Sequence, residues 1–102
     1  MRLDDAAPGW PQLRNLLNPI APQIASLNVR PAMYGHKAVL RFTNDYGVEI
    51  FKHTDDDFFE MTVIRFRGGS YEFAFDTAIP DLNLGCNDED VLRVCKDVSM
   101  LK

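Results

Sequence analysis

The feature that most constrains the fold is a two-residue alternation of apolar and polar side chains through the middle of the chain. It begins in the stretch HKAVLRFT, where Ala38, Leu40 and Phe42 fall on one side and more polar residues fall between them. Successive side chains of a β-strand point to opposite faces, so this alternation predicts half-buried strands rather than helices.

Turn residues divide the alternating region into four strands. The first turn is NDYG, the second contains the triplet Asp55, Asp56 and Asp57, and the third is RGGS, whose paired glycines accept the positive φ angles of a tight hairpin. The sequence therefore predicts a four-stranded antiparallel meander over residues 36 to 77, followed by a loop that contains Pro80 and Gly85. The positions that alternate in the second, third and fourth strands are Val48, Ile50, Lys52, Phe59, Met61, Val63, Tyr71, Phe73 and Phe75.

Helical spacing precedes and follows this sheet. Residues 1 to 35 contain five of the six prolines, and Trp10, Leu13 and Leu17 recur at helical intervals. We expect one helix over about residues 11 to 18 and a further helical turn or two over about residues 21 to 28. Trp10 is expected to anchor this segment to the core.

The C-terminal stretch NDEDVLRVCKDVSMLK predicts an amphipathic helix within residues 86 to 101. Asn87 is a favourable N-cap, and the three acids after it lie where the helix dipole favours negative charge. Together these elements predict one α+β domain of 102 residues, with the terminal helices covering one face of the sheet.

Charge is distributed unevenly along the chain. The formal net charge is −4, but residues 6 to 43 carry +4, and residues 44 to 90 carry twelve acids and three bases, or −9. This balance argues against direct nucleic-acid binding and favours an acidic sheet face that contacts a basic partner, with carboxylates spaced like a run of phosphates. The candidate partner-binding residues are Asp45, Glu49, Asp55, Asp56, Asp57, Glu60 and Glu72.

Enzymatic chemistry has less support. His53, Asp55 and Asp57, with Glu60, contain metal-binding groups, so a metal-dependent hydrolase is the alternative hypothesis, although a solvated turn explains the same residues. Carboxylate pairs such as Glu49 with Glu72, or Asp76 with Glu60, are equally well explained as exposed strand positions. The sequence has no phosphate-binding glycine loop and no recognisable nucleophile next to a histidine, so we expect no enzyme activity and no cofactor.

The two cysteines and the apolar runs bear on the compartment. Cys86 and Cys95 do not form a disulfide framework; Cys95 is expected to be a buried apolar residue, and Cys86 is expected in a loop without a role. No apolar run approaches the roughly 20 residues that span a bilayer, and MRLDDAAPGWPQLRN lacks the apolar region of a signal peptide. We therefore expect a cytoplasmic protein without membrane contact.

The last 60 or so residues resemble a group of small, uncharacterised bacteriophage and prophage accessory proteins. The resemblance is carried by Tyr46-Gly47, by Phe59-Glu60-Met61-Thr62-Val63, by Phe75-Asp76-Thr77-Ala78-Ile79 and by the helix start Asn87-Asp88-Glu89-Asp90-Val91-Leu92. Ala78 stands where the family pattern has proline, and the aspartate triplet replaces a longer loop. The resemblance implies a non-enzymatic binding protein that inhibits a host or defence protein, including an anti-CRISPR role. A structural homodimer, formed through an edge strand or the terminal helices, is a further alternative.

Overall fold

The computed structural model describes residues 9 to 102. The first eight residues, which include part of the expected Pro-rich segment and of the stretch examined for a signal peptide, lie outside this description. The elements, in chain order, are α2 (Pro11–Leu17), the 3₁₀ helix η1 (Asn18–Gln23), β1 (Ile24–Ala32), β2 (Gly35–Phe42), β3 (Tyr46–His53), β4 (Phe59–Arg67), β5 (Ser70–Phe73), β6 (Leu82–Cys86) and α3 (Asp88–Ser99).

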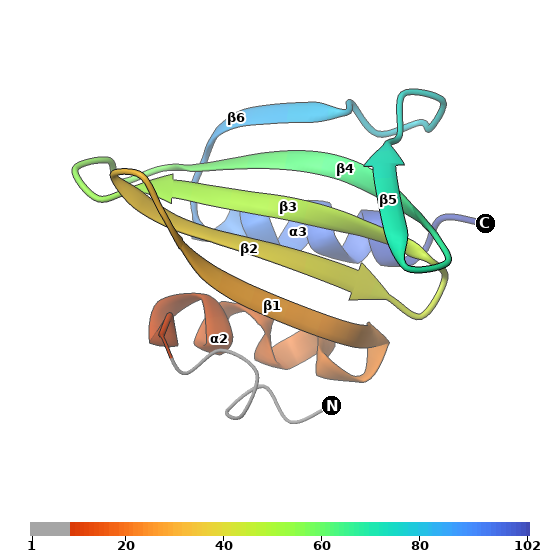
Figure 1. Ribbon diagram of the computed structural model, residues 1–102, viewed down its shortest axis with the longest axis horizontal. Helices are drawn as coiled ribbons and strands as arrows, with labels where there is room; N and C mark the ends of the chain where they lie inside the picture. Colours follow the sequence, from red (N-terminus) through yellow and green to blue (C-terminus); the bar gives the residue numbers. More distant parts are fainter. Residues whose placement is uncertain (1–8) are drawn as a thin grey trace.

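The strands form one antiparallel sheet with the order β1-β2-β3-β4-β5, and β6 also pairs with β4. Both β5 and β6 therefore lie against the same edge of β4: β6 pairs with its first half, and β5 pairs with its second half. Figure 1 shows β6 running beside β4, while β5 stands across the front of the sheet at an angle to the other strands. The predicted α+β class is confirmed, and the sheet has six strands among the described residues instead of the four expected.

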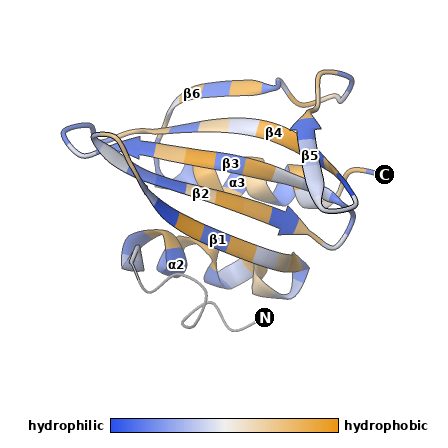
Figure 2. Cartoon of the chain, viewed as in Figure 1, coloured by the Kyte–Doolittle hydropathy of each residue, from blue (hydrophilic) through white to orange (hydrophobic). Residues whose placement is uncertain are grey.

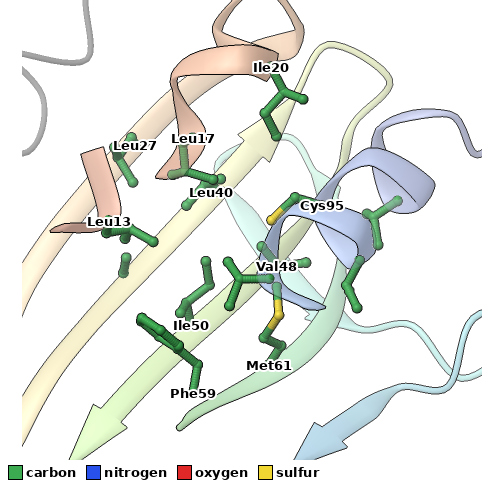
Figure 3. Packing of buried hydrophobic residues seen from close by; sticks show 14 of the residues in the cluster. Leu13, Leu17, Ile20, Leu27, Leu40, Val48, Ile50, Phe59, Met61 and Cys95 are labelled. Atoms are coloured by element: carbon green, nitrogen blue, oxygen red, sulfur yellow. The ribbon is translucent and has the colours of Figure 1, made fainter. Parts of the chain in front are cut away.

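Within residues 9 to 102, α2 and α3 cover the same face of this sheet. Apolar side chains from α2, α3 and the strands meet between the helical layer and the sheet (Figure 3). Orange and blue bands recur along β2 and β3 in Figure 2, and every second residue from Ala38 to Phe42, together with Val48 and Ile50, is buried. The predicted core positions of β2, β3 and β4 are fully buried: Ala38, Leu40, Phe42, Val48, Ile50, Phe59, Met61 and Val63.

Trp10 anchors the N-terminal segment to this core, as predicted. Its side chain is only 5% exposed. The indole ring lies 5.4 Å from the His36 ring and 5.9 Å from the Phe59 ring, centroid to centroid. Pro11 follows as the first residue of α2, where its missing N–H breaks no helical hydrogen bond.

The start of α3 is also as predicted. The Asn87 side chain accepts a hydrogen bond from the Asp90 N–H at 2.8 Å, and the Asp90 carboxylate accepts one from the Asn87 N–H at 3.1 Å. This reciprocal capping box satisfies donors that a helix start would otherwise leave unpaired. Val91, Val94 and Val98 then place the apolar stripe of the helix in the core.

The helical turn or two expected over about residues 21 to 28 is present only as far as Gln23, and the expectation is wrong from Ile24 onward. The 3₁₀ helix ends at Gln23, and Ile24 begins the nine-residue strand β1. Leu27 pairs with Leu40 across the β1–β2 ladder and is buried beside it, so partnership with a neighbouring strand outweighs a weak local helical pattern.

The segment after β5 also differs from the expectation. The stretch that was predicted to be a loop contains β6, which pairs with β4 through the register Thr62–Leu82 and Met61–Asn83. Gly85, with a φ of 61°, interrupts the regular strand geometry, which is why the sequence pattern looks like a loop. The fourth predicted strand is shorter than expected and ends at Phe73.

The other face of the sheet is not covered by α2, η1 or α3. Residues directly opposite in a ladder share a face, so the pairings Val39–Glu49–Thr62 and Lys37–Phe51–Glu60 place these side chains on the face opposite the core. The β4–β5 hairpin folds toward this open face, since Tyr71 reaches Glu49 on β3. The open face therefore combines charged and aromatic side chains.

Candidate functional site

The seven candidate acids lie in different parts of the molecule. Asp45 lies in the turn before β3, and the aspartate triplet lies in the turn after it. The eight residues of β3 separate these two turns by roughly 25 Å, at about 3.3 Å per residue. Glu49 and Glu60 share the open face, whereas Glu72 is opposite Arg65 and lies on the other side of the sheet.

Three of the seven acids are neutralised by a neighbouring base. The ion pairs are Arg41 Nη2–Asp45 Oδ1 at 2.6 Å, Lys37 Nζ–Glu49 Oε1 at 3.5 Å and Arg67 Nε–Glu72 Oε1 at 2.6 Å. Two further acids outside the predicted set, Asp76 and Asp90, pair with Arg65 and Arg93. The open face also carries the bases of β2 beside its carboxylates, so its charge is mixed.

The aspartate triplet instead lies next to the start of α3. Asp57 lines a shallow cavity of about 350 Å³ together with Asn87, Asp88 and Glu89. We call Asp55, Asp56, Asp57, Asp88 and Glu89 the acidic end. Within residues 9 to 102, no ion pair involves any of these five carboxylates.

Local hydrogen bonds hold the triplet in a tight turn, so the turn interpretation of these residues is confirmed. The Asp56 carboxylate accepts a hydrogen bond from the Phe58 N–H at 3.1 Å, and the Asp55 N–H donates to His53 Nδ1 at 3.2 Å. The Asp56 N–H also donates to the His53 carbonyl at 3.1 Å. These bonds position the backbone and leave the three carboxylates exposed to solvent.

A metal site does not form at these positions. In the part of the chain that the structure describes, no three His, Cys, Asp or Glu side chains lie close enough to hold a metal ion. His53 stacks on Tyr34 with 5.9 Å between ring centroids, and its Nδ1 accepts the Asp55 N–H. The metal-dependent hydrolase alternative thus has no ligand set among residues 9 to 102.

Three of the four acids in the proposed acid–base pairs, Glu49, Glu72 and Asp76, are engaged in contacts with bases. Hydrogen bonds from Arg65 lower the pKa of Asp76, which keeps this carboxyl ionised. Arg65 is held in turn by the Tyr46 hydroxyl at 2.6 Å and lies over the Tyr46 ring. This network links β3, β4 and the segment that follows β5.

The hydrogen bond of the Tyr71 hydroxyl makes the stability of the folded chain depend on pH in the alkaline range. Its hydroxyl donates a hydrogen bond of 2.5 Å to Glu49 Oε2, and this bond, followed by burial, raises the pKa of Tyr71 to about 12. The neutral phenol is thus favoured in the folded state. The stabilisation of the folded state by the protonated Tyr71 hydroxyl is fully present below the pKa of an unfolded tyrosine, about 10. It is lost as the pH rises toward 12. Absorbance titration at 295 nm should show one late-titrating tyrosine, and Glu49→Gln should lower its pKa; an unchanged titration in that variant would contradict the assignment.

Both cysteines are buried and unpaired. Cys95 is fully buried on α3, as expected, whereas Cys86 is only 4% exposed instead of lying in an exposed loop. Burial raises the pKa of both thiols, which keeps them in the unreactive protonated form. We assign them packing roles.

One feature beside β5 is not evident from the sequence. A groove of about 560 Å³ runs along this strand, and we call it the β5 groove; it is lined by Arg65, Tyr71, Glu72, Phe73, Phe75 and Asp76. Phe73 is 51% exposed and Phe75 is 73% exposed. The available signal is the run YEFAF, whose aromatic residues alternate, but only the structure shows that α2, η1 and α3 leave Phe73 and Phe75 exposed.

The chain matches no known protein-family model, no curated protein and no solved structure. Among the described residues, no helix is both long and apolar enough to cross a membrane. The two features of this chain that bear on its function are therefore the acidic end and the β5 groove.

Proposed function

We propose that this chain is a non-enzymatic binding protein that uses its acidic end to contact a basic surface on a partner protein. The observation that supports this proposal is a contrast in pairing: Asp45, Glu49 and Glu72 each pair with a base, whereas the five clustered carboxylates of the acidic end form no ion pair among residues 9 to 102. An unpaired group of like charges gains most from an external basic partner.

The acidic end has the geometry of a contact site for long basic side chains. It combines the β3–β4 turn with the first turn of α3, and the shallow cavity between them is polar. Asp88 and Glu89 also stabilise the helix start through the dipole, so the aspartate triplet is the part whose charge lacks an evident role in folding. Its field would increase the association rate with a basic partner and weaken as salt is added.

The partner class that we propose is a host or defence protein of a bacterial cell, with a basic surface that normally holds nucleic acid. This part of the proposal rests on the charge distribution and on the resemblance to phage accessory proteins. It includes an inhibitory, anti-CRISPR-like role in the cytoplasm, in which the aspartates occupy positions that phosphates would otherwise take.

The test compares two triple variants that remove the same charge from different places. The first is Asp55→Asn, Asp56→Asn, Asp57→Asn, which keeps side-chain size and the oxygen that accepts the Phe58 N–H. The control is Asp45→Asn, Asp81→Asn, Asp97→Asn, away from the acidic end. Bacterial lysate is passed over each immobilised protein, and the captured partner is then purified for calorimetry.

We expect the first triple variant to bind the purified partner about tenfold more weakly or worse, a loss of about 1.4 kcal/mol, while the control binds like the wild type. The affinity of the wild type for the purified partner should also decrease as the salt concentration is raised from about 50 to about 200 mM, because added ions screen the attraction between exposed charges. Equal weakening in both variants would mean that net charge alone matters, and full retention in both would place the contact elsewhere.

A further inference from the structure

Among the strands that the structure describes, β5 has one edge paired with β4 and one free edge. The hairpin turn contains only Gly68 and Gly69, which makes Arg67 and Ser70 the first pair of the ladder. In such a ladder, hydrogen-bonded and non-hydrogen-bonded pairs alternate. The Ala74 N–H donates a hydrogen bond to the Val63 carbonyl at 3.0 Å, and this bond shows which pairs of the ladder are the hydrogen-bonded ones.

As a result of this alternation, the backbone N–H and C=O groups of Tyr71 and Phe73 point away from β4. Glu72 and Ala74 bond toward β4, so the N–H and C=O groups of Tyr71 and Phe73 point to the opposite side of the strand. Phe66, which is opposite Tyr71, agrees with this, since its N–H bonds to the Asp45 carbonyl toward β3. Within the described chain, no strand pairs with the outer edge of β5 (Figure 1).

The β5 groove lies along this strand and offers an apolar surface beside the free backbone groups. Phe73 and Phe75 contact each other edge to face, with 6.3 Å between ring centroids. The charged residues of the groove are already paired, Arg65 with Asp76 at 3.0 Å and Arg67 with Glu72 at 2.6 Å. An apolar, uncharged segment therefore suits this surface better than a charged one.

The exposed area is small for a stable homodimer. Tyr71, Phe73 and Phe75 are 39, 51 and 73% exposed, and with about 200 Å² for each aromatic side chain they offer on the order of 300 Å². Two copies would bury about 600 Å² between these rings, whereas specific stable interfaces bury about 1,200 Å² or more. Four strand residues likewise provide few backbone pairs. A short extended segment matches this footprint better than a second copy.

We propose that the free edge of β5 binds an extended segment of a partner protein by strand addition. The segment pairs with the backbone of Tyr71 and Phe73 and places apolar side chains, two residues apart, against Phe73 and Phe75. This site is separate from the acidic end and does not depend on it, so either can fail without the other.

The probe is a displayed library of random twelve-residue peptides, selected on the folded wild-type chain with all aspartates intact. Recovered peptides are synthesised, and their affinities are measured by fluorescence polarisation. We expect uncharged sequences with apolar residues at alternate positions. Amide exchange at Tyr71 and Phe73 should slow at least tenfold when such a peptide binds.

Two variants test the site: Phe73→Pro changes the backbone together with one ring of the groove, and Phe75→Ser changes a ring alone. Phe73→Pro removes the outward N–H without removing a ladder bond to β4 and should abolish binding; Phe75→Ser keeps the backbone and should weaken binding at least tenfold. Met33→Ser, at a side chain that is 79% exposed in a different turn, is the matched control and should leave affinity unchanged. If Phe73→Pro is not folded by circular dichroism, Phe75→Ser and the exchange data still decide.

Three results would overturn the proposal. Recovery of no peptide that binds in solution would exclude strand addition at this edge, and peptides that bind both variants as tightly as the wild type would place the site elsewhere. Sedimentation that shows a dimer lost in Phe73→Pro and Phe75→Ser would make a second copy the occupant.

Discussion

Replacing Trp10 with alanine is expected to destabilise the folded chain by about 3–5 kcal/mol, the range for removing a large buried aromatic side chain. Trp10 is nearly fully buried and lies against both Phe59 and His36. It stands immediately before α2, so its loss should also release the helix from the sheet. The cavity cannot be filled easily because the surrounding strand residues are held in register by their ladders.

Urea unfolding followed by far-UV circular dichroism measures this loss, since the variant has no tryptophan left to report fluorescence. Tyr34→Ala is the matched control: this aromatic side chain is 71% exposed in the β1–β2 turn, and surface substitutions usually change stability by less than about 0.5 kcal/mol. A loss below about 1 kcal/mol for Trp10→Ala would show that the residue is not an anchor and would favour a role at the surface.

Gly47→Ala is expected to cost about 1–3 kcal/mol, or more if the sheet cannot adjust. Gly47 lies in β3 between Arg41 on β2 and Ile64 on β4. A Cβ at this position would lie 1.9 Å from the Leu40 carbonyl oxygen and 3.0 Å from the Phe66 ring. The oxygen belongs to the backbone of a central strand, so relief requires a shift of β2 itself.

The control for this prediction is Gly69→Ala in the β4–β5 hairpin. A Cβ there meets nothing within 4 Å, and Gly69 does not have the positive φ of its neighbour Gly68. Thermal unfolding of both variants should show a clear decrease in Tm for Gly47→Ala and little change for Gly69→Ala. Equal Tm values would mean that β2 and β3 separate at low cost, contrary to the close approach seen here.

The sequence predicts best those elements whose signals are local. The capping residues of α3 and the apolar stripe after them are contained within one stretch of chain. The turns on either side of β3 likewise place the alternating residues of β2 to β4 in antiparallel hairpins. In these cases short-range chemistry and tertiary packing favour the same structure.

The strands β1 and β6 could not be predicted because the residues that determine their conformation, those of the partner strands β2 and β4, lie in other parts of the chain. The residues from Ile24 onward follow two prolines and show no strict alternation, and Leu27 becomes a strand residue by packing beside Leu40. Leu82 and Leu84 remain 52% and 63% exposed, so β6 has little inward-facing apolar pattern. Pairing with β4 determines its conformation.

The candidate site was predictable in composition but not in arrangement. A list of acids cannot show which have basic neighbours, because pairs such as Lys37 with Glu49 arise from the register of adjacent strands. Nor does it show that Asp57 lies beside Asp88, about thirty residues further along the chain. The turn interpretation of the triplet needed only the local preferences of aspartate.

The order of strands also bears on how the chain reaches this structure. Each strand from β1 to β5 pairs with its immediate neighbour in sequence, so these pairings close only short loops, and only β6 returns past β5 to reach β4. Short closures favour rapid folding, and we expect the meander to form hairpin by hairpin. Because α3 lies after every strand in the chain, a meander that forms during synthesis exposes part of its apolar face until α3 leaves the ribosome, and this interval is when aggregation competes most strongly with folding.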